Sequence, residues 1–183
     1  MKKLLIITGD MAAGKSAFAQ TLAERYQAAV FQKDKIKEIL GDMIGFSSRE
    51  ENLKLSHAAI EIMEHIFETL AKTGESLILE ANYHEDEQKR LCELAERYEY
   101  QVLTLLIQGD VDVLYQRYMH RIKEENRHPV HLSTTFHIQA DFNAAIMNAR
   151  SELMSGETIK VNASDFSYQT DENLLSILDR FMK

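Results

Sequence analysis

Residues 4–17 read Leu-Leu-Ile-Ile-Thr-Gly-Asp-Met-Ala-Ala-Gly-Lys-Ser-Ala, an apolar run that leads directly into the pattern G-x-x-x-x-G-K-[ST]. This pattern is typical of a loop whose backbone N–H groups surround the phosphates of a nucleotide. Gly9 and Gly14 permit backbone torsions that a Cβ atom would hinder, so successive N–H groups can face one anion. Apolar residues recur at helical spacing from Ala17 to Ala23, which directs a helix N-terminus at the same anion. The stretch therefore predicts a phosphate-binding loop between a strand and a helix.

Two polar side chains of this loop have predicted roles in the binding of a nucleoside triphosphate. Lys15 places a positive charge on the β- and γ-phosphates, and the hydroxyl of Ser16 is a ligand for the Mg²⁺ that bridges them. We expect the whole loop to contact the nucleotide, namely Gly9, Asp10, Met11, Ala12, Ala13, Gly14, Lys15, Ser16 and Ala17. The alternative is a chance glycine-rich turn, which the strand before the loop and the helix after it disfavour.

The length and composition indicate one domain in a reducing compartment. With 183 residues, 45% of them hydrophobic, and no Pro-, Gly- or Ser-rich linker, the chain is expected to form a single domain over residues 1–183. Its one cysteine excludes an internal disulfide, which favours the cytoplasm. No apolar run approaches the ~18 residues that span a bilayer, so no membrane partner is expected. The net charge of −8 argues against a broad nucleic-acid-binding surface.

Short apolar segments alternate with helical patterns along the chain. Strands are expected at residues 4–8, 28–32, 76–81, 101–108 and 158–161, and helices at 14–26, 35–43, 48–74, 85–97, from 111, 133–154 and 171–181. Apolar strands separated by helices predict a parallel sheet with helices on both faces. Ligands bind beyond the carboxyl ends of such strands, where the sequence places Gly9, Asp34, Glu80 and Gln108.

Asp34 and Lys37 follow the second expected strand. The carboxylate of Asp34 is a candidate base that accepts the proton of an attacking hydroxyl during phosphoryl transfer. Lys37 lies three residues further along the first helical turn and could hold an anionic part of the substrate. The alternative is that Asp34 only caps a helix that begins at Lys35.

Glu80 ends the third expected strand, after Leu-Ile-Leu at residues 77–79. An acidic residue in this place resembles a Walker-B position, which holds Mg²⁺ or its bound water. The alternative is a structural carboxylate that needs another partner at the edge of the core. Tyr83, just beyond, is a candidate for the acceptor pocket, although an ordinary loop position remains equally open.

A basic segment follows the fourth strand. Arg117, Arg121, Lys123 and Arg127 stand there against two glutamates. We expect a lid over residues 117–133, in which Arg117, Arg121 or Arg127 stabilises charge on the transferring phosphoryl group. The alternative is the solvated end of an amphipathic helix. Three histidines (128, 131 and 137) lie nearby, but their spacing fits no strong zinc pattern.

In their order along the chain, these motifs resemble the P-loop small-molecule kinases. This group includes AAA_33, chloramphenicol phosphotransferase-like, zeta-toxin-like and gluconate-kinase-like proteins and the kinase domain of polynucleotide kinase. The similarity covers most of the chain: the loop at 9–16, Asp34 with Lys37, Glu80-Ala81-Asn82 with Arg90 downstream, the arginines before Pro129, and Val161-Asn162-Ala163-Ser164. The last of these segments is similar to one that borders the adenine in such folds.

The resemblance implies a three-layer α/β/α fold with a five-stranded parallel sheet in the order 2-3-1-4-5 and a helical lid. It also implies ATP with Mg²⁺, nucleotide contacts at Arg117, Asn162 and Ala163, and an acceptor contact at Asn82. Two differences from related families bear on the class of acceptor molecule. The chain lacks the Gly-x-Pro-Gly-x-Gly-Lys and Asp-Gly-x-Pro-Arg segments of adenylate-kinase-like proteins, and Lys35 stands where polynucleotide-kinase-like chains often have a second acid.

The sequence therefore favours an ATP-dependent kinase that phosphorylates a hydroxyl of a small molecule and acts as a monomer or homodimer. Two other classes stay open. One is an ATP-binding regulator that binds a protein partner, and the other is a 5′-hydroxyl kinase that acts on nucleic acid. A GTPase switch is disfavoured because the chain lacks an Asn-Lys-x-Asp guanine motif.

Overall fold

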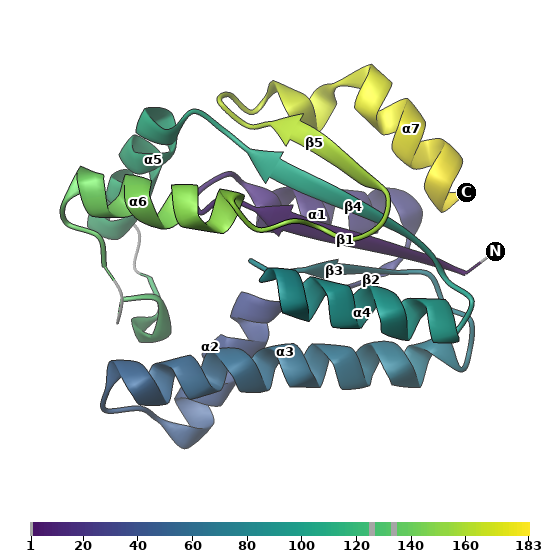
Figure 1. The fold of residues 1–183 in the computed structure, drawn as a ribbon, viewed down its shortest axis with the longest axis horizontal. Coiled ribbons are helices and arrows are strands. Elements are labelled where there is room, and N and C mark those ends of the chain that lie inside the picture. Colours follow the sequence, from purple (N-terminus) through teal and green to yellow (C-terminus); the bar gives the residue numbers. More distant parts are fainter. Residues whose placement is uncertain (1, 125–126, 133–134) are drawn as a thin grey trace.

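In the computed structural model, which describes residues 2–124, 127–132 and 135–183, five parallel strands form one sheet. The strands are β1 (Lys3–Gly9), β2 (Ala29–Gln32), β3 (Leu77–Glu80), β4 (Gln101–Gln108) and β5 (Thr158–Asn162). They are arranged in the order β2-β3-β1-β4-β5 (Figure 1). This confirms the predicted α/β fold class and the predicted strand order.

Helices cover both faces of the sheet. They are α1 (Lys15–Tyr26), α2 (Lys33–Ile44), α3 (Arg49–Ala71), α4 (Glu85–Arg97), α5 (Val111–Glu124), α6 (Gln139–Arg150) and α7 (Glu172–Met182). In Figure 1, α3 and α4 lie on one side of the sheet, and α2, α5 and α6 lie toward the end to which the strand arrows point. Two short 3₁₀ helices, Pro129–His131 and Ser167–Thr170, complete the described elements.

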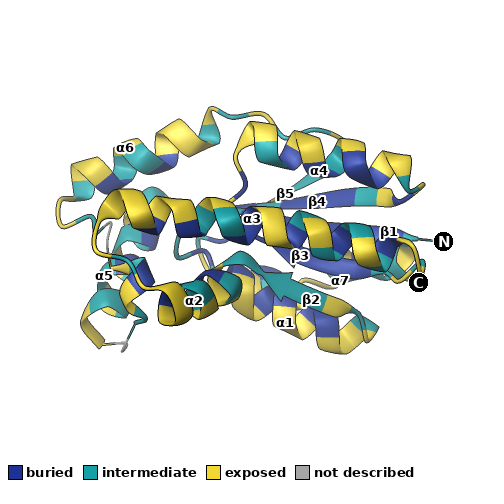
Figure 2. Cartoon of the chain, turned by 90° about the horizontal axis from the view of Figure 1, so that it is seen from below, coloured by how far each residue is buried: buried dark blue, intermediate teal, exposed yellow. Residues whose placement is uncertain are grey.

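The alternation of side chains along β1 explains the three layers. Leu5 and Ile7 belong to the cluster that includes the apolar faces of α1 and α7, whereas Leu4 and Ile6 belong to the cluster under α3 and α4. All four side chains are fully buried, because a central parallel strand meets helices on both sides. Figure 2 shows the central strands β3 and β4 as largely buried and the outer helix α6 as largely exposed. None of the helices in the described residues is long and apolar enough to cross a bilayer.

The helix predicted over residues 133–154 is much shorter in the structure. It spans Gln139–Arg150, and residues 133–134 lie outside the described part of the chain. The chain leaves the helix after Arg150 because Ser155 is tied to α4: its N–H donates to Gln88 Oε1 (2.8 Å), and its carbonyl accepts from Gln88 Nε2 (2.9 Å). The predicted helix also included Leu153, whose backbone N–H instead donates to Glu85 Oε2 on α4 (3.1 Å).

Gly9 meets a steric requirement at the end of β1. Its φ is 124°, and a Cβ atom added there would overlap the carbonyl oxygen of Ile107 on β4. We expect Gly9→Ala to lower the free energy of unfolding by about 2–4 kcal/mol, measured by urea denaturation, through backbone strain and overpacking. Gly45→Ala is the matched control, since Gly45 also has a positive φ (77°) but a Cβ atom added there would meet no heavy atom within 4 Å. Equal losses in the two variants would contradict the steric explanation.

Candidate active site

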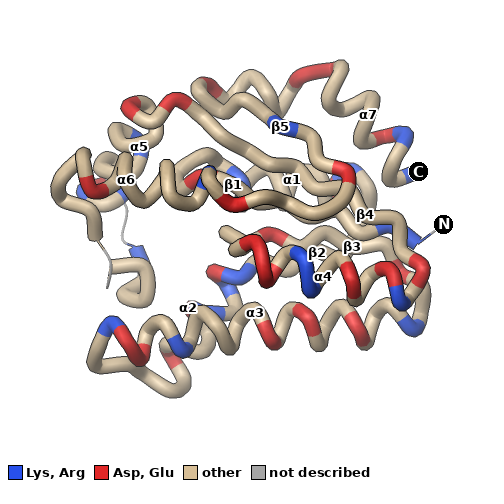
Figure 3. The backbone as a smooth tube through the Cα atoms, viewed as in Figure 1, with Lys and Arg blue, Asp and Glu red and all other residues tan. Residues whose placement is uncertain are grey.

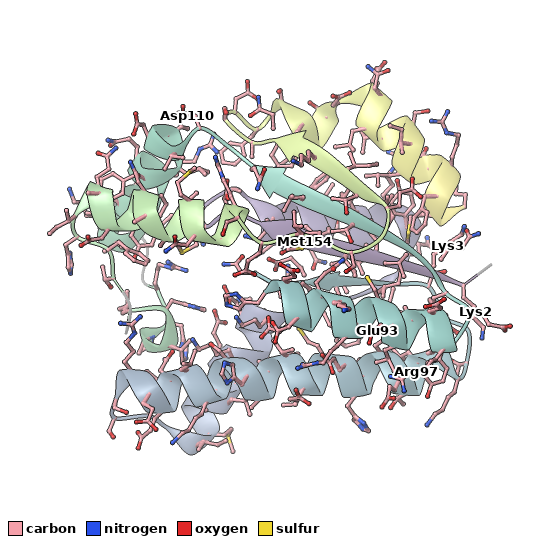
Figure 4. The ribbon with its side chains drawn as sticks, viewed as in Figure 1. Lys2, Lys3, Glu93, Arg97, Asp110 and Met154 are labelled. Atoms are coloured by element: carbon pink, nitrogen blue, oxygen red, sulfur yellow. The ribbon has the colours of Figure 1, made fainter. Side chains whose placement is uncertain are left out.

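A cavity of about 780 Å³ lies at the carboxyl ends of the strands. Asp110, which follows β4, marks this end in Figure 4, whereas Lys2 and Lys3 lie at the opposite end of the sheet. The cavity is lined by the loop before α1, by residues after β2 and β3, and by side chains from α5 and the segment after it. These residues include Met11, Ala12, Ala13, Gly14, Lys15, Ser16, Ala17, Asp34, Lys37, Asn52, Glu80, Ala81, Asn82, Arg117, Arg121, Arg127, His131 and Phe166.

The loop between β1 and α1 has the backbone of an anion-binding nest. Positive φ angles recur at Gly9 (124°), Ala12 (59°) and Gly14 (86°), the conformation in which successive N–H groups turn toward one centre. Gly14 is also the N-cap of α1 and carries no side-chain cap, so the first N–H groups of the helix remain available to a ligand. This geometry fits the phosphate chain of a nucleotide.

Asp10 is not among the residues that line the cavity, and its side chain is bound by other residues of the protein. Its carboxylate is bound by Arg150 (Nη2 to Oδ2, 2.6 Å) and accepts from the N–H of Gly109 (3.0 Å). Its carbonyl oxygen accepts from Lys15 Nζ (2.7 Å). Gly9 and Asp10 belong to the loop but do not line the cavity, whereas the residues from Met11 to Ala17 do.

Lys15, Ser16 and Glu80 form the polar centre of the cavity floor. Ser16 Oγ donates to Glu80 Oε2 (3.0 Å), and Lys15 and Glu80 are only 7% and 4% exposed. Burial lowers the pKa of Lys15, and the charges of Glu80 and two aspartates oppose that shift. Burial raises the pKa of Glu80, against the effect of the Lys15 charge. Two buried, oppositely charged groups thus stabilise each other in a place that a polyanion and its cation can enter.

The hydroxyl of Ser16 and the carboxylate of Glu80 are the hard oxygen ligands that suit Mg²⁺. Among the residues that the structure describes, no group of three or more His, Cys, Asp or Glu side chains is arranged to hold a metal ion. Mg²⁺ usually keeps several waters and takes phosphate oxygens as ligands, so it needs only one or two oxygen ligands from the protein. The donor set fits a metal that arrives with a nucleotide.

Asp34 lies in the first turn of α2, at the wall of the cavity. The helix begins at Lys33 and its N-cap is Gln32, so the interpretation of Asp34 as the cap of a helix that begins at Lys35 is wrong. Gln32 is held in place by a hydrogen bond from its Nε2 to the carbonyl oxygen of Ser16 (2.7 Å). The carboxylate of Asp34 is 55% exposed and lines the cavity. A substrate can therefore reach it.

Lys37 and Asn52 converge on one backbone carbonyl. Lys37 Nζ (3.4 Å) and Asn52 Nδ2 (3.0 Å) both donate to the oxygen of Val130, and both side chains are buried and line the cavity. Burial lowers the pKa of Lys37. Asn82, predicted as an acceptor contact, lines the same cavity from the loop after β3. Asn52 was not predicted from the sequence, because it lies within a long helix and has no motif around it.

Arg117 connects α5 to the segment after β5. Its guanidinium donates to the carbonyl oxygens of Ala163 (2.6 Å) and Ser164 (2.9 Å) and lies 4.0 Å from the ring centroid of Phe166. Asn162 accepts from the N–H of Ser164 (2.9 Å), and Ala163 is fully buried. Asn162 and Ala163 therefore shape this segment, while Phe166, which was not predicted from the sequence, lines the cavity itself.

Arg121 and Arg127, the other two predicted lid arginines, both line the cavity. Arg121 is on α5, and Arg127 precedes the 3₁₀ helix Pro129–His131. Of the predicted lid over residues 117–133, residues 125, 126 and 133 lie outside the described residues. The described part of that segment brings three arginines to one cavity.

Tyr83 is not brought to the cavity. It belongs to the core cluster under α3 and α4, and its N–H donates to Thr8 Oγ1 (3.1 Å). Among the described residues its hydroxyl has no hydrogen-bond partner, and burial raises its pKa well above the usual value. The prediction of a substrate contact at Tyr83 is therefore not supported, because the chain after β3 alternates and turns Asn82 outward and Tyr83 inward.

We expect Tyr83→Phe to leave the free energy of unfolding unchanged or to raise it by up to about 1 kcal/mol. The hydroxyl of Tyr83 loses its hydrogen bonds to water when the protein folds and gains no protein partner among the described residues, so its removal should not destabilise the fold. Tyr168→Phe is the contrasting variant, since the buried hydroxyl of Tyr168 donates to the carbonyl oxygen of Ala13 (2.9 Å). Its loss should cost about 1–2 kcal/mol. Urea denaturation of both variants checks the expectation, and a larger loss for Tyr83→Phe than for Tyr168→Phe would contradict it.

Comparisons with known proteins agree with this geometry. Residues 4–144 match the model of the family AAA_33, described as an AAA domain. A search of curated proteins found no match. A solved structure from Chloroflexus aurantiacus, named as a "putative kinase", is 27% identical, with 99% of this chain and 98% of that chain covered and a TM-score of 0.81.

Two other solved structures share the fold at lower identity. A sugar kinase from Janibacter sp. HTCC2649 is 17% identical, with 98% of this chain and 95% of that chain covered and a TM-score of 0.64. A gluconokinase from Sinorhizobium meliloti 1021 is 13% identical, with 98% and 93% covered and a TM-score of 0.63. At these identities the likeness concerns the fold alone.

Proposed function

The chain belongs to the AAA_33 family of AAA domains, and on that basis we propose that it is an ATP-dependent phosphotransferase that transfers the γ-phosphate of MgATP to a hydroxyl of a small molecule. Its fold and phosphate-binding loop are those of P-loop small-molecule kinases. One observation carries the proposal: Lys15, the Ser16–Glu80 pair and Asp34 all line the same cavity. A phosphate-binding lysine, a magnesium-binding pair and a base are the groups that phosphoryl transfer requires.

The nucleotide half of the cavity lies over the loop before α1. The N–H groups of the loop and the ammonium of Lys15 would bind the β- and γ-phosphates, and Ser16 and Glu80 would hold Mg²⁺ directly or through water. When bound, Mg²⁺ neutralises charge on the phosphates. We place the nucleoside near Arg117 and Phe166, since these side chains line the cavity beside Gly14.

The acceptor half of the cavity lies along α2. The oxygen of the acceptor hydroxyl forms a bond to the γ-phosphorus, and Asp34 accepts the proton of that hydroxyl. The bond from the γ-phosphorus to the bridging β–γ oxygen breaks at the same time, which releases ADP. Lys37 and Asn82 line this half and would bind polar or anionic groups of the acceptor. Arg121 and Arg127 would stabilise the charge on the transferring group, as parts of a lid over residues 117–133.

Small acceptors suit this chain better than nucleic acid. Acidic residues recur along α3 and α4 (Figure 3), and the net charge is −8, so the surface offers little attraction to a polyanionic strand. We propose a single domain that acts in the cytoplasm as a monomer or homodimer. An ATP-binding regulator would share the nucleotide half of the cavity and lack an acceptor.

The test is a screen of the purified protein with MgATP and a metabolite extract, with phosphorylated products identified by mass spectrometry. We expect one hydroxyl compound to gain a phosphoryl group in a reaction that consumes ATP and needs Mg²⁺. Binding of ATP without a phosphorylated product, together with a stoichiometric protein partner, would support the regulator and contradict the kinase. Phosphorylation of oligonucleotide 5′-hydroxyls would support the nucleic-acid kinase.

A further inference from the structure

The turn formed by residues 128–131, which we call the histidine turn, docks on one face of α2. Asp34, Glu38 and Asp42 recur on that face at intervals of four residues. His128 Nε2 lies 2.9 Å from Asp42 Oδ1, and His131 Nε2 lies 2.9 Å from Glu38 Oε1. Two histidines of the turn thus pair with two carboxylates of the helix.

The position of the histidine turn is fixed by its backbone as well. A Cβ atom at Gly41 would overlap Val130 Cγ1, so a glycine is needed for the turn to approach the helix this closely. The carbonyl oxygen of Val130 accepts from both Lys37 and Asn52. The side chain of Val130 is itself buried. Contacts with α2 and α3 therefore place His131 at the cavity independently of its own side chain.

The ring of His131 is oriented by Glu38. Burial acts to raise the pKa of Glu38, but hydrogen bonds from His131 and Lys35 outweigh it and lower the pKa, so the carboxylate is ionised at neutral pH. An ionised carboxylate only accepts, and Nε2 of His131 must therefore carry the hydrogen of this bond. The other ring nitrogen, Nδ1, then faces Asp34, with 4.0 Å between Nδ1 and Oδ2. His131 is 11% exposed and lines the cavity.

One oxygen atom can bond both of these groups at once. The 4.0 Å between His131 Nδ1 and Asp34 Oδ2 is shorter than twice the ~2.8 Å length of a hydrogen bond, so an oxygen between them can reach both. A hydroxyl has one proton, and the carboxylate of Asp34 can only accept it. Both bonds form together only when Nδ1 donates, which requires the doubly protonated imidazole.

We propose that His131 binds the acceptor: its Nδ1–H donates to the hydroxyl oxygen whose proton passes to Asp34. This rests on the proposed phosphotransferase function and assigns to the same site a second residue that holds the reacting hydroxyl. The histidine turn thereby completes the acceptor site, because Asp34 alone leaves the rotation of the hydroxyl unspecified. Binding through the oxygen and proton removal then act on the same atom.

Other charged groups lie near His131 or line the same cavity, and their contributions must be separated from that of His131. Helix α2 contributes Asp34, Lys37 and Glu38, and the cavity wall contributes His120, Arg121 and Arg127. The histidine turn contributes His128, whose ring centroid is 6.3 Å from that of His131. A matched pair of histidine variants separates these contributions. His128 pairs with an α2 carboxylate at the same distance as His131 but is not among the residues that line the cavity.

The experiment compares His131→Ala, His131→Gln and His128→Ala with the wild-type protein, using MgATP and the acceptor found in the extract screen. We expect His131→Ala to lower kcat/KM by about 10- to 100-fold, the value of a lost hydrogen bond to a charged group. His128→Ala should stay within about threefold of wild type, because its partner Asp42 is largely exposed. Thermal melting verifies that all variants are folded.

The glutamine variant gives the decisive readout. His131→Gln keeps a side-chain N–H that can donate to the hydroxyl oxygen, so it should retain more activity than His131→Ala, and neither variant should change the KM for ATP. If the wild-type protein transfers phosphate and His131→Gln is no more active than His131→Ala, or if both alanine variants are equally active, the role of His131 is wrong. A wild-type protein without any transfer overturns the phosphotransferase function, and this role with it.

Discussion

Lys15→Ala is expected to abolish phosphoryl transfer, with kcat/KM lowered by about 10³-fold or more, because the lost charge acts on the γ-phosphate as it is transferred. Lys15 is held for this task by the hydrogen bond from its Nζ to the carbonyl oxygen of Asp10, and it is buried beside Glu80. An ammonium that is already desolvated loses little when a phosphate replaces its present partners. Its removal also leaves the carboxylate of Glu80 without its main opposite charge.

Two measurements check this expectation. Titration calorimetry with MgATP should show binding to the wild-type protein and a greatly reduced heat for Lys15→Ala, and turnover should fall in parallel. Lys54→Ala is the matched control, because it removes the same charge from the surface of α3, where the Lys54 side chain is 70% exposed and forms an ion pair with Glu50. If Lys15→Ala bound and turned over ATP as the wild type does, the nucleotide site would not lie on this loop.

The strands and the phosphate-binding loop could be predicted because their signals are local. Leu4, Leu5, Ile6 and Ile7 are consecutive apolar residues, and such a run is typical of a strand buried on both faces. The loop is recognised from four fixed positions within eight residues. The strand order, in contrast, came from the resemblance to a family, since alternating strands and helices alone leave several parallel orders possible.

The parts of the site that escaped prediction depend on contacts between distant residues. Asn52 is defined by its bond to Val130, 78 residues later in the chain, and His131 by its position beside Glu38, 93 residues earlier. No local pattern marks such pairs. Tyr83 was misplaced for a related reason: after the fully buried strand β3, Asn82 is exposed but Tyr83 is buried again in the core, where a loop that faces the substrate was expected.

Asp34→Asn is expected to lower kcat by about 10³-fold with little change in the KM for ATP, because the amide has the shape of the carboxylate but cannot accept the hydroxyl proton. Asp34 stands at the start of α2, outside the loop whose N–H groups are proposed to bind the phosphates, so its loss should leave that loop intact. Asp42→Asn, the same change two turns further along the helix, should remain close to wild type, since Asp42 is largely exposed.

Steady-state kinetics of Asp34→Asn with the identified acceptor distinguish a base from a positioning group. A variant that only lost orientation would raise the KM for the acceptor and lower kcat less than about 10-fold, a range well below that of a missing general base. That result would contradict the base assignment and leave Asp34 as the partner that fixes the hydroxyl opposite His131, whereas a fall in kcat alone identifies the carboxylate as the proton acceptor.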